Sequence, residues 1–169
     1  NKKLLRSINP KNKKFIVWKP RHANYKGHFR NSSMKPPLKL FEYLKCNDYM
    51  IFSLDNYDTY IPFDNYVNLK KTFKWDLLES FIFYLDYFAE VHMVGDTGGW
   101  ASAFLLDKPL IIYDVGITTA FFRGVSKCLI LSKLFESKTT KRILSIEELF
   151  VLTNQIVEKD ISPQKVYKF

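Results

Sequence analysis

The chain has 169 residues, of which 47% are hydrophobic, and a formal net charge of +9. This length accommodates one good-sized domain and is too short for two, and the apolar share excludes a disordered chain. Its two cysteines, Cys46 and Cys128, stand far apart, so neither a disulfide framework nor a zinc site is predicted, and a reducing, cytoplasmic location is expected.

The positive charge is concentrated at the amino-terminal end. Residues 1–40 hold twelve Lys or Arg and no Asp or Glu, whereas the remaining 129 residues hold fourteen basic and seventeen acidic groups. Such a cluster attracts nucleotide phosphates, anionic lipid or nucleic acid, although a solvated basic face is the simpler alternative. Residues 1–13 are interpreted as a basic lead-in or short helix, and 14–169 as the domain. Because the chain starts at Asn1 rather than Met, a piece of a longer protein is expected.

The first half of the domain alternates strands with a helix. Short apolar runs predict strands at 15–18, 49–54 and 66–69, and apolar spacing behind Pro36 predicts a helix over 36–45. A long basic loop, 21–37, separates the first strand from this helix. Loops of that length inside a compact domain are usually functional or mobile.

The second half repeats the alternation. Helices are predicted at 76–89, where Asp76 begins or caps the helix, at 100–106, and from Ser145 to about residue 159, where Glu148 gives the spacing of a capping box. Strands are predicted at 91–95, 110–113 and 128–131. Alternating strands and helices imply right-handed crossovers and a mostly parallel sheet, hence a Rossmann-like three-layer α/β domain.

The sharpest motif is the turn Asp96-Thr97-Gly98-Gly99, which joins the strand ending at Gly95 to a helix. Backbone N–H groups at a helix start and the helix dipole attract phosphate, and two glycines let it approach the backbone. In open α/β sheets such sites lie at the carboxyl ends of strands. A turn that only joins strand to helix is the alternative.

A second candidate segment follows the first strand, at Lys19-Pro20-Arg21-His22. Lys19, Arg21 and His22 are expected to approach the same phosphates from the opposite side, since the Arg fork suits phosphate oxygens. His22 is a candidate hydrogen-bond donor, or an acid toward a leaving phosphate. The alternative is a solvated loop.

Other polar residues are weaker candidates. Asp114, at the end of a predicted strand, either binds a donor hydroxyl or caps a turn, and Arg123 is a candidate phosphate or acceptor contact. The acidic loop after Leu54, starting at Asp55, is interpreted as an ordinary loop, with hydroxyl binding as the alternative. His92 is interpreted as a satisfied buried residue. No metal site is predicted, because the acidic spacing matches no established loop.

The Asp96–Gly99 turn followed by Lys108-Pro109 resembles the carboxyl-terminal domain of GT-B glycosyltransferases and their relatives. UDP-N-acetylglucosamine 2-epimerases have a similar Asp-Ser-Gly-Gly turn and Lys-Pro strand. CDP-glycerol glycerophosphotransferases have an Asp-Tyr-Ser-Ser turn there and a basic strand end with a His-Pro pair, which the segment at Lys19 resembles. The resemblance extends over about 145 residues in the order of the predicted strands and helices, but at the level of amino-acid identity it covers only two short motifs.

The resemblance implies that Thr97, Gly98 and Gly99 hold a nucleotide diphosphate, with Arg21 or His22 opposite. It further implies the donor-binding half of a glycosyl- or polyol-phosphate transferase in surface polysaccharide assembly. Its substrates would be a nucleotide-activated donor and a saccharide or polyol-phosphate acceptor, with no resident cofactor. The acceptor domain of these families precedes this part, so the piece alone is expected to bind donor without necessarily turning it over.

The basic front end predicts peripheral contact with anionic lipid at the inner face of the membrane. Two other functions stay open. The basic forty residues would also fit a nucleic-acid-binding module, but the glycine turn lies far along the chain from them. A non-catalytic interaction domain that has kept the fold and lost its donor is the third.

Overall fold

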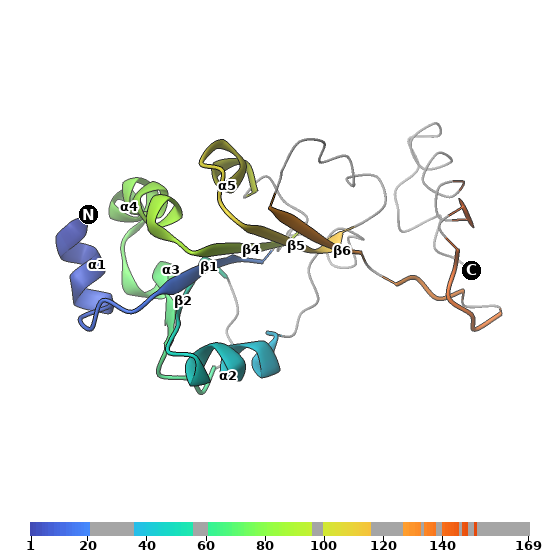
Figure 1. Ribbon diagram of the computed structural model, residues 1–169, viewed down its shortest axis with the longest axis horizontal. Coiled ribbons are helices and arrows are strands. Elements are labelled where there is room, and N and C mark those ends of the chain that lie inside the picture. The colour runs from blue at the N-terminus through green and yellow to red at the C-terminus, as the bar shows by residue number, and fades with distance from the viewer. Residues whose placement is uncertain are drawn as a thin grey trace.

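The computed structural model describes residues 1–20, 36–55, 61–95, 100–115, 127–132, 134–137, 140–145, 147–148 and 151. Within these ranges the chain forms one sheet of six strands, in the order β3-β2-β1-β4-β5-β6 (Figure 1). The strands are β1 (Phe15–Lys19), β2 (Met50–Ser53), β3 (Tyr66–Asn68), β4 (Val91–Gly95), β5 (Leu110–Val115) and β6 (Cys128–Ser132). Every pairing within this sheet is parallel, which confirms the predicted Rossmann-like α/β class.

Helices flank both faces of the sheet. They are α1 (Lys2–Ile8), α2 (Leu38–Cys46), α3 (Leu69–Thr72), α4 (Trp75–Phe88) and α5 (Ala101–Leu105). In Figure 1, α4 and α5 lie above the sheet and α2 lies below it. The basic lead-in contributes to the core, because Leu4, Leu5 and Ile8 of α1 pack against the cluster beneath α4.

Strand β1 shows why the sheet is covered on both faces. Successive side chains of a strand point to opposite faces, so Phe15 and Val17 pack with α4, whereas Ile16 and Trp18 pack with α2. All five β1 residues are buried, including the polar Lys19. A central strand of a parallel sheet is typically apolar throughout for this reason. A charged residue at its end is therefore unusual.

Three predicted boundaries are corrected. The strand predicted at 66–69 ends at Asn68, because the Asn68 side chain accepts hydrogen bonds from the Lys70 and Lys71 amides and starts α3. Helix α4 begins at Trp75 behind Lys74, so Asp76 lies in the first turn and does not cap it. Strand β5 continues through Asp114 to Val115.

The capping box predicted at Ser145 is confirmed. The Ser145 amide donates to Oε2 of Glu148 at 2.8 Å, and the Glu148 amide donates to the Ser145 hydroxyl at 3.3 Å. Arg142 holds the same carboxylate from the other side through both its terminal nitrogens. This pairing, followed by the Ser145 bonds, lowers the pKa of Glu148 to about 2.

Candidate functional site at the strand-order reversal

The strand order reverses between β1 and β4. From β1 the chain builds outward through β2 and β3, then returns to place β4, β5 and β6 on the other side of β1. In open α/β sheets, ligands bind outside the carboxyl ends of the strands at such a reversal. The carboxyl ends of β1 and β4 lie side by side here, with Trp18 opposite Met93 and Lys19 opposite Val94. The fold therefore points to this edge as its binding region.

Both sequence motifs begin at this reversal. Lys19 is the last residue of β1 and precedes the basic segment, while Gly95 is the last residue of β4 and precedes the glycine turn. The residues themselves, Arg21, His22, Asp96, Thr97, Gly98 and Gly99, lie outside the described residues, as does Arg123. Their roles stay predictions, but the strands to which the two motifs are attached are neighbours.

Lys19 is a buried cation at the end of β1. Its ammonium lies 2.6 Å from Oδ2 of Asp86 on α4 and 3.2 Å from the hydroxyl of Ser102 on α5. Lys19 is 8% exposed and Asp86 1% exposed, so most of the pair is shielded from water. A direct contact between Lys19 and phosphate stays a prediction, and any such ligand would share the ammonium with Asp86.

His92 adds a second partner to Asp86. The ring is fully buried, and its Nε2 donates to the Asp86 carbonyl oxygen at 3.0 Å. Burial lowers the pKa of His92, and Lys19 and Lys108 act in the same direction, while the Asp86 carboxylate opposes them. The ring is then neutral with its proton on Nε2. The prediction that His92 is buried is confirmed, but the ring is satisfied only at Nε2, because Nδ1 has no hydrogen-bond partner among the described residues.

One side of His92 carries an unfavourable contact. With the proton on Nε2, the bare Nδ1 faces Oδ1 of Asp86 at 3.5 Å. Within the described part of the chain, neither atom has a hydrogen-bond partner. Two acceptors facing each other in a buried place cost free energy, because neither recovers the hydration it has lost. The Lys19–Asp86–His92 cluster is therefore constrained but not fully satisfied.

Asp86 and Ser102 were missed as site residues in the sequence. Asp86 stands four residues after Ile82 on α4, a position where helical spacing predicts an apolar side chain next to the core. A carboxylate at such a position is the signal that could have identified it. Ser102 gives no comparable signal, since a serine in the first turn of a helix is common.

Asp55 lies at the end of β2 and forms a closed polar cluster. Its carboxylate accepts hydrogen bonds from the hydroxyls of Ser53 and Tyr66 and from the Asn68 amide at 3.1 Å. Asp55 is 1% exposed. Burial, and then the bond to Asp55, raise the pKa of Tyr66. The carboxylate thus orders the ends of β2 and β3 and is no exposed loop residue.

Asp114 occupies a special backbone position in β5. Its φ is 55°, in the left-handed region, and the pairing of β5 with β6 shifts register between Tyr113 and Val115. Asp is one of the few residues that tolerate this region. A bulge of this kind re-aims a side chain and is common beside active sites. The bulge lies two strands from β1, at the carboxyl end of β5.

A cavity of about 650 Å³ lies elsewhere, along the outer edge of β3. Its described lining includes Lys45, Asp64, Tyr66 and Lys71, but neither Lys19 nor Asp114. Lys45 and Asp64 are paired at 2.9 Å within it. Volume alone would favour this cavity as the binding site, whereas the strand order and both motifs favour the reversal. The strand order is a property of the whole sheet, whereas this cavity lies beside its edge strand and lacks Lys19.

No group of three or more His, Cys, Asp or Glu that could hold a metal ion occurs within the described ranges. Nor does any helix in those ranges combine the length and the apolar character needed to cross a membrane. Comparison of the chain with models of protein families, with curated proteins and with solved structures finds no match.

Proposed function

We propose that the chain binds the diphosphate of a nucleotide-activated donor at the reversal between β1 and β4, as the donor-binding half of a glycosyl- or polyol-phosphate transferase. The observation that carries this proposal is the register of Lys19 opposite Val94. Through it, the basic segment and the glycine turn leave the sheet from adjacent strands, where ligands bind in open α/β sheets.

The described residues supply part of the expected chemistry. Lys19 and Ser102 provide an ammonium and a hydroxyl that already lie 3.2 Å apart and join β1 to α5. Gly95 ends β4 without a side chain, so the chain at the start of the turn leaves room for a ligand. Asp114 provides a carboxylate for sugar or polyol hydroxyls from the neighbouring strand end.

The proposal of transferase activity rests on the resemblance of the Asp96–Gly99 turn and Lys108-Pro109 to GT-B enzymes. In glycosyl transfer the bond from the sugar to the diphosphate breaks, and the nucleoside diphosphate leaves with increased negative charge. In polyol-phosphate transfer the phosphoanhydride bond breaks instead, and the nucleoside monophosphate leaves with the added charge. Donors fixed around that diphosphate stabilise the transition state more than the ground state. Lys19, Arg21, Thr97 and the Gly98 and Gly99 amides are the proposed donors, and His22 is the proposed acid toward the leaving phosphate.

A thermal-shift screen with UDP, CDP, GDP and CMP tests donor binding. A ligand that binds only the folded chain raises its melting temperature, so at least one nucleoside diphosphate should raise it more than CMP does. Gly98→Val should abolish this shift, because its side chain would occupy the space of the phosphate. Gly124→Val, the same exchange at a glycine outside the motif, is the matched control. The proposal fails if no nucleotide shifts the melt or if both variants respond alike.

A further inference from the structure

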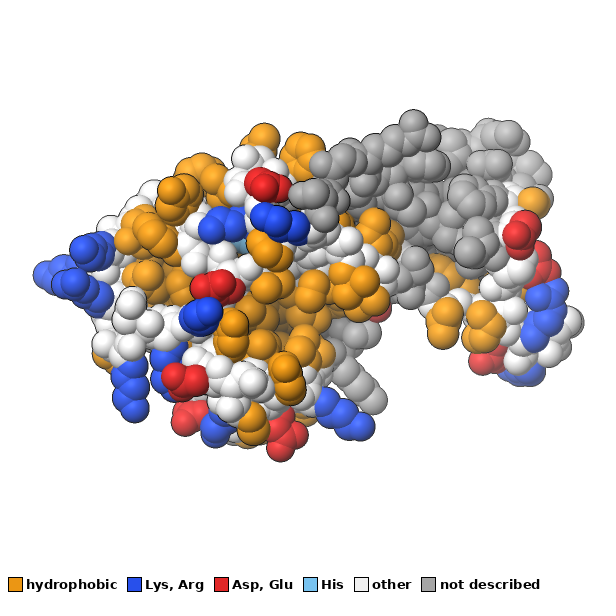
Figure 2. All heavy atoms as spheres, in the orientation of Figure 1, with side chains coloured by type: hydrophobic (Ala, Val, Ile, Leu, Met, Phe, Trp, Pro, Cys, Tyr) orange, Lys and Arg blue, Asp and Glu red, His pale blue; other side chains and the backbone are white. Residues whose placement is uncertain are grey.

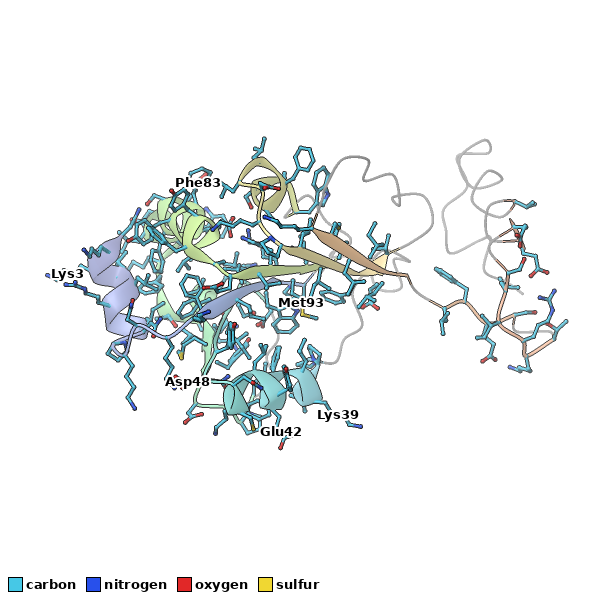
Figure 3. The ribbon with its side chains drawn as sticks, viewed as in Figure 1. Lys3, Lys39, Glu42, Asp48, Phe83 and Met93 are labelled. Carbon is cyan, nitrogen blue, oxygen red and sulfur yellow. The ribbon has the colours of Figure 1, made fainter. Side chains whose placement is uncertain are left out.

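The outer face of α4 is apolar, as is the face toward the core. Ten of the fourteen residues in its sequence WDLLESFIFYLDYF are apolar or aromatic. Leu78, Phe81 and Leu85 fill the core. A helix that is apolar all round is normally buried on all sides. Figure 3 shows Phe83 on the outer side of α4, pointing away from the sheet.

The exposed apolar residues of α4 continue onto α5. We call this surface the α4–α5 face, and it consists of Trp75, Phe83, Tyr87, Phe88, Phe104 and Leu105, which are between 42% and 77% exposed. Hydrophobic side chains are visible over both helices in Figure 2. The rings of Tyr87 and Phe88 lie 5.0 Å apart. An exposed patch of this kind marks an interaction site.

The size of the α4–α5 face fits a protein interface. Large apolar and aromatic side chains each present roughly 200 Å² when fully exposed, so these six leave about 700 Å² accessible. A specific protein–protein interface of standard size buries about 800 Å² on each partner. The face therefore falls within the standard range, which extends down to about 600 Å² on each partner.

The acidic and basic groups on this face are placed so that two copies of the face could pair opposite charges. Glu79 is exposed and stands four residues before Phe83 on the same side of the helix, and Tyr87 stands four residues after it. The ammonium of Lys108 lies 5.5 Å from the centre of the Tyr87 ring. On the α4–α5 face, the acidic Glu79 and the basic Lys108 beside Tyr87 therefore lie on opposite sides of Phe83, each about one helical turn away along α4.

We propose that the α4–α5 face binds a second copy of this chain through a two-fold axis near Phe83, with the two α4 helices antiparallel. A two-fold contact brings residue i opposite residue j and j opposite i. An axis at Phe83 sets Glu79 opposite position 87 of the other helix, and so beside Lys108 of the partner subunit. An anionic lipid surface fits less well, because Asp76 and Glu79 are both exposed on this side.

Sedimentation equilibrium of the chain over a range of concentrations tests this proposal. The wild type should show a monomer–dimer equilibrium. Phe83→Glu should raise the dimer dissociation constant at least about 30-fold, as expected for a central aromatic residue. Tyr43→Glu, which introduces the same charge at an exposed aromatic of α2, should leave the constant unchanged. Circular dichroism checks that each variant is folded.

A charge exchange tests the antiparallel geometry. Glu79→Lys and Lys108→Glu should each weaken the dimer about fivefold, and the double variant should restore it, because opposite charges again face each other. The proposal is overturned if the wild type is monomeric up to its highest soluble concentration. It is likewise overturned if the monomer binds anionic vesicles in a manner that Phe83→Glu abolishes, or if the double variant is weaker than either single one.

Discussion

The ammonium of Lys19 lies 2.6 Å from Oδ2 of Asp86, and this contact joins the last residue of β1 to the last turn of α4, the helix that covers it. The pair spans 67 residues of sequence and places a cation at the edge where the strand order reverses. Since Asp86 also faces His92, the position of Lys19 depends on a cluster that crosses β1, α4 and β4.

Removing one partner of this pair should destabilise the fold far more than removing both. Asp86→Leu leaves a buried ammonium uncompensated and should lower the free energy of unfolding by about 3–5 kcal/mol, and Lys19→Met should act similarly. The double variant Lys19→Met/Asp86→Leu should lose less than either single variant, because no unpaired charge stays buried. Urea unfolding of the four proteins measures the cycle.

The exposed pair Lys45–Asp64, at 2.9 Å, is the matched control for this cycle. Asp64→Ala should leave the urea midpoint close to that of the wild type, because water screens this pair. Additive losses at Lys19 and Asp86 would contradict the interpretation of the pair as a buried unit.

The stability of the fold should fall as the pH drops below the ordinary His pKa of 6.5. Burial lowers the pKa of His92 in the folded chain, so below 6.5 the unfolded chain binds a proton that the native ring does not. Neutral His92 therefore makes its full contribution to the free energy of unfolding above pH 6.5, and this contribution is lost as the pH falls below that value. The free energy of unfolding of the wild type minus that of His92→Gln should shrink over this range. A difference that does not vary with pH would contradict a lowered pKa.

The hydrogen bond between Trp18 and Tyr113 should contribute measurably to stability. Nε1 of Trp18 donates to the Tyr113 hydroxyl at 2.8 Å and joins β1 to β5 across β4. Tyr113→Phe removes this acceptor, and the loss of the bond should cost about 1 kcal/mol in chemical unfolding. Tyr43→Phe, at a 64% exposed tyrosine, should be nearly neutral. Equal effects of the two exchanges would show that the bond adds nothing.

The arrangement of the sheet could be predicted because its signals are local. The runs 15–18 and 91–95 are apolar and bounded by Pro20 and by Gly95 with the turn after it, so each reveals a strand without knowledge of its neighbours. The same local signals predicted that Lys19 and Gly95 lie at strand ends. It also favoured a parallel sheet, in which such ends share one edge.

The partners of the charged groups could not be predicted, because they are distant in sequence. Nothing near Asp86 shows that it meets Lys19, and nothing near Asp55 shows that Tyr66 and Asn68 converge on it. Asp55 followed a strand and preceded an Asn- and Asp-rich stretch, which is typical of a loop. Only the pairing of β2 with β3 brings its partners into reach and buries it.

The bulge at Asp114 should separate the roles of its backbone and its carboxylate. Because φ is 55°, Asp114→Gly should be more stable than Asp114→Ala by about 1 kcal/mol, although Gly usually weakens a strand. Urea unfolding of the two variants makes this comparison with no side-chain polar group in either. An Ala variant as stable as the Gly variant would show that the left-handed conformation is not kept.

A third exchange at this position tests the carboxylate. Asp114→Asn tolerates the same φ and removes only the charge. If the carboxylate binds donor hydroxyls, the Asn variant should show a smaller nucleotide-sugar shift relative to its own ligand-free melt, while its shift with the bare nucleoside diphosphate stays unchanged.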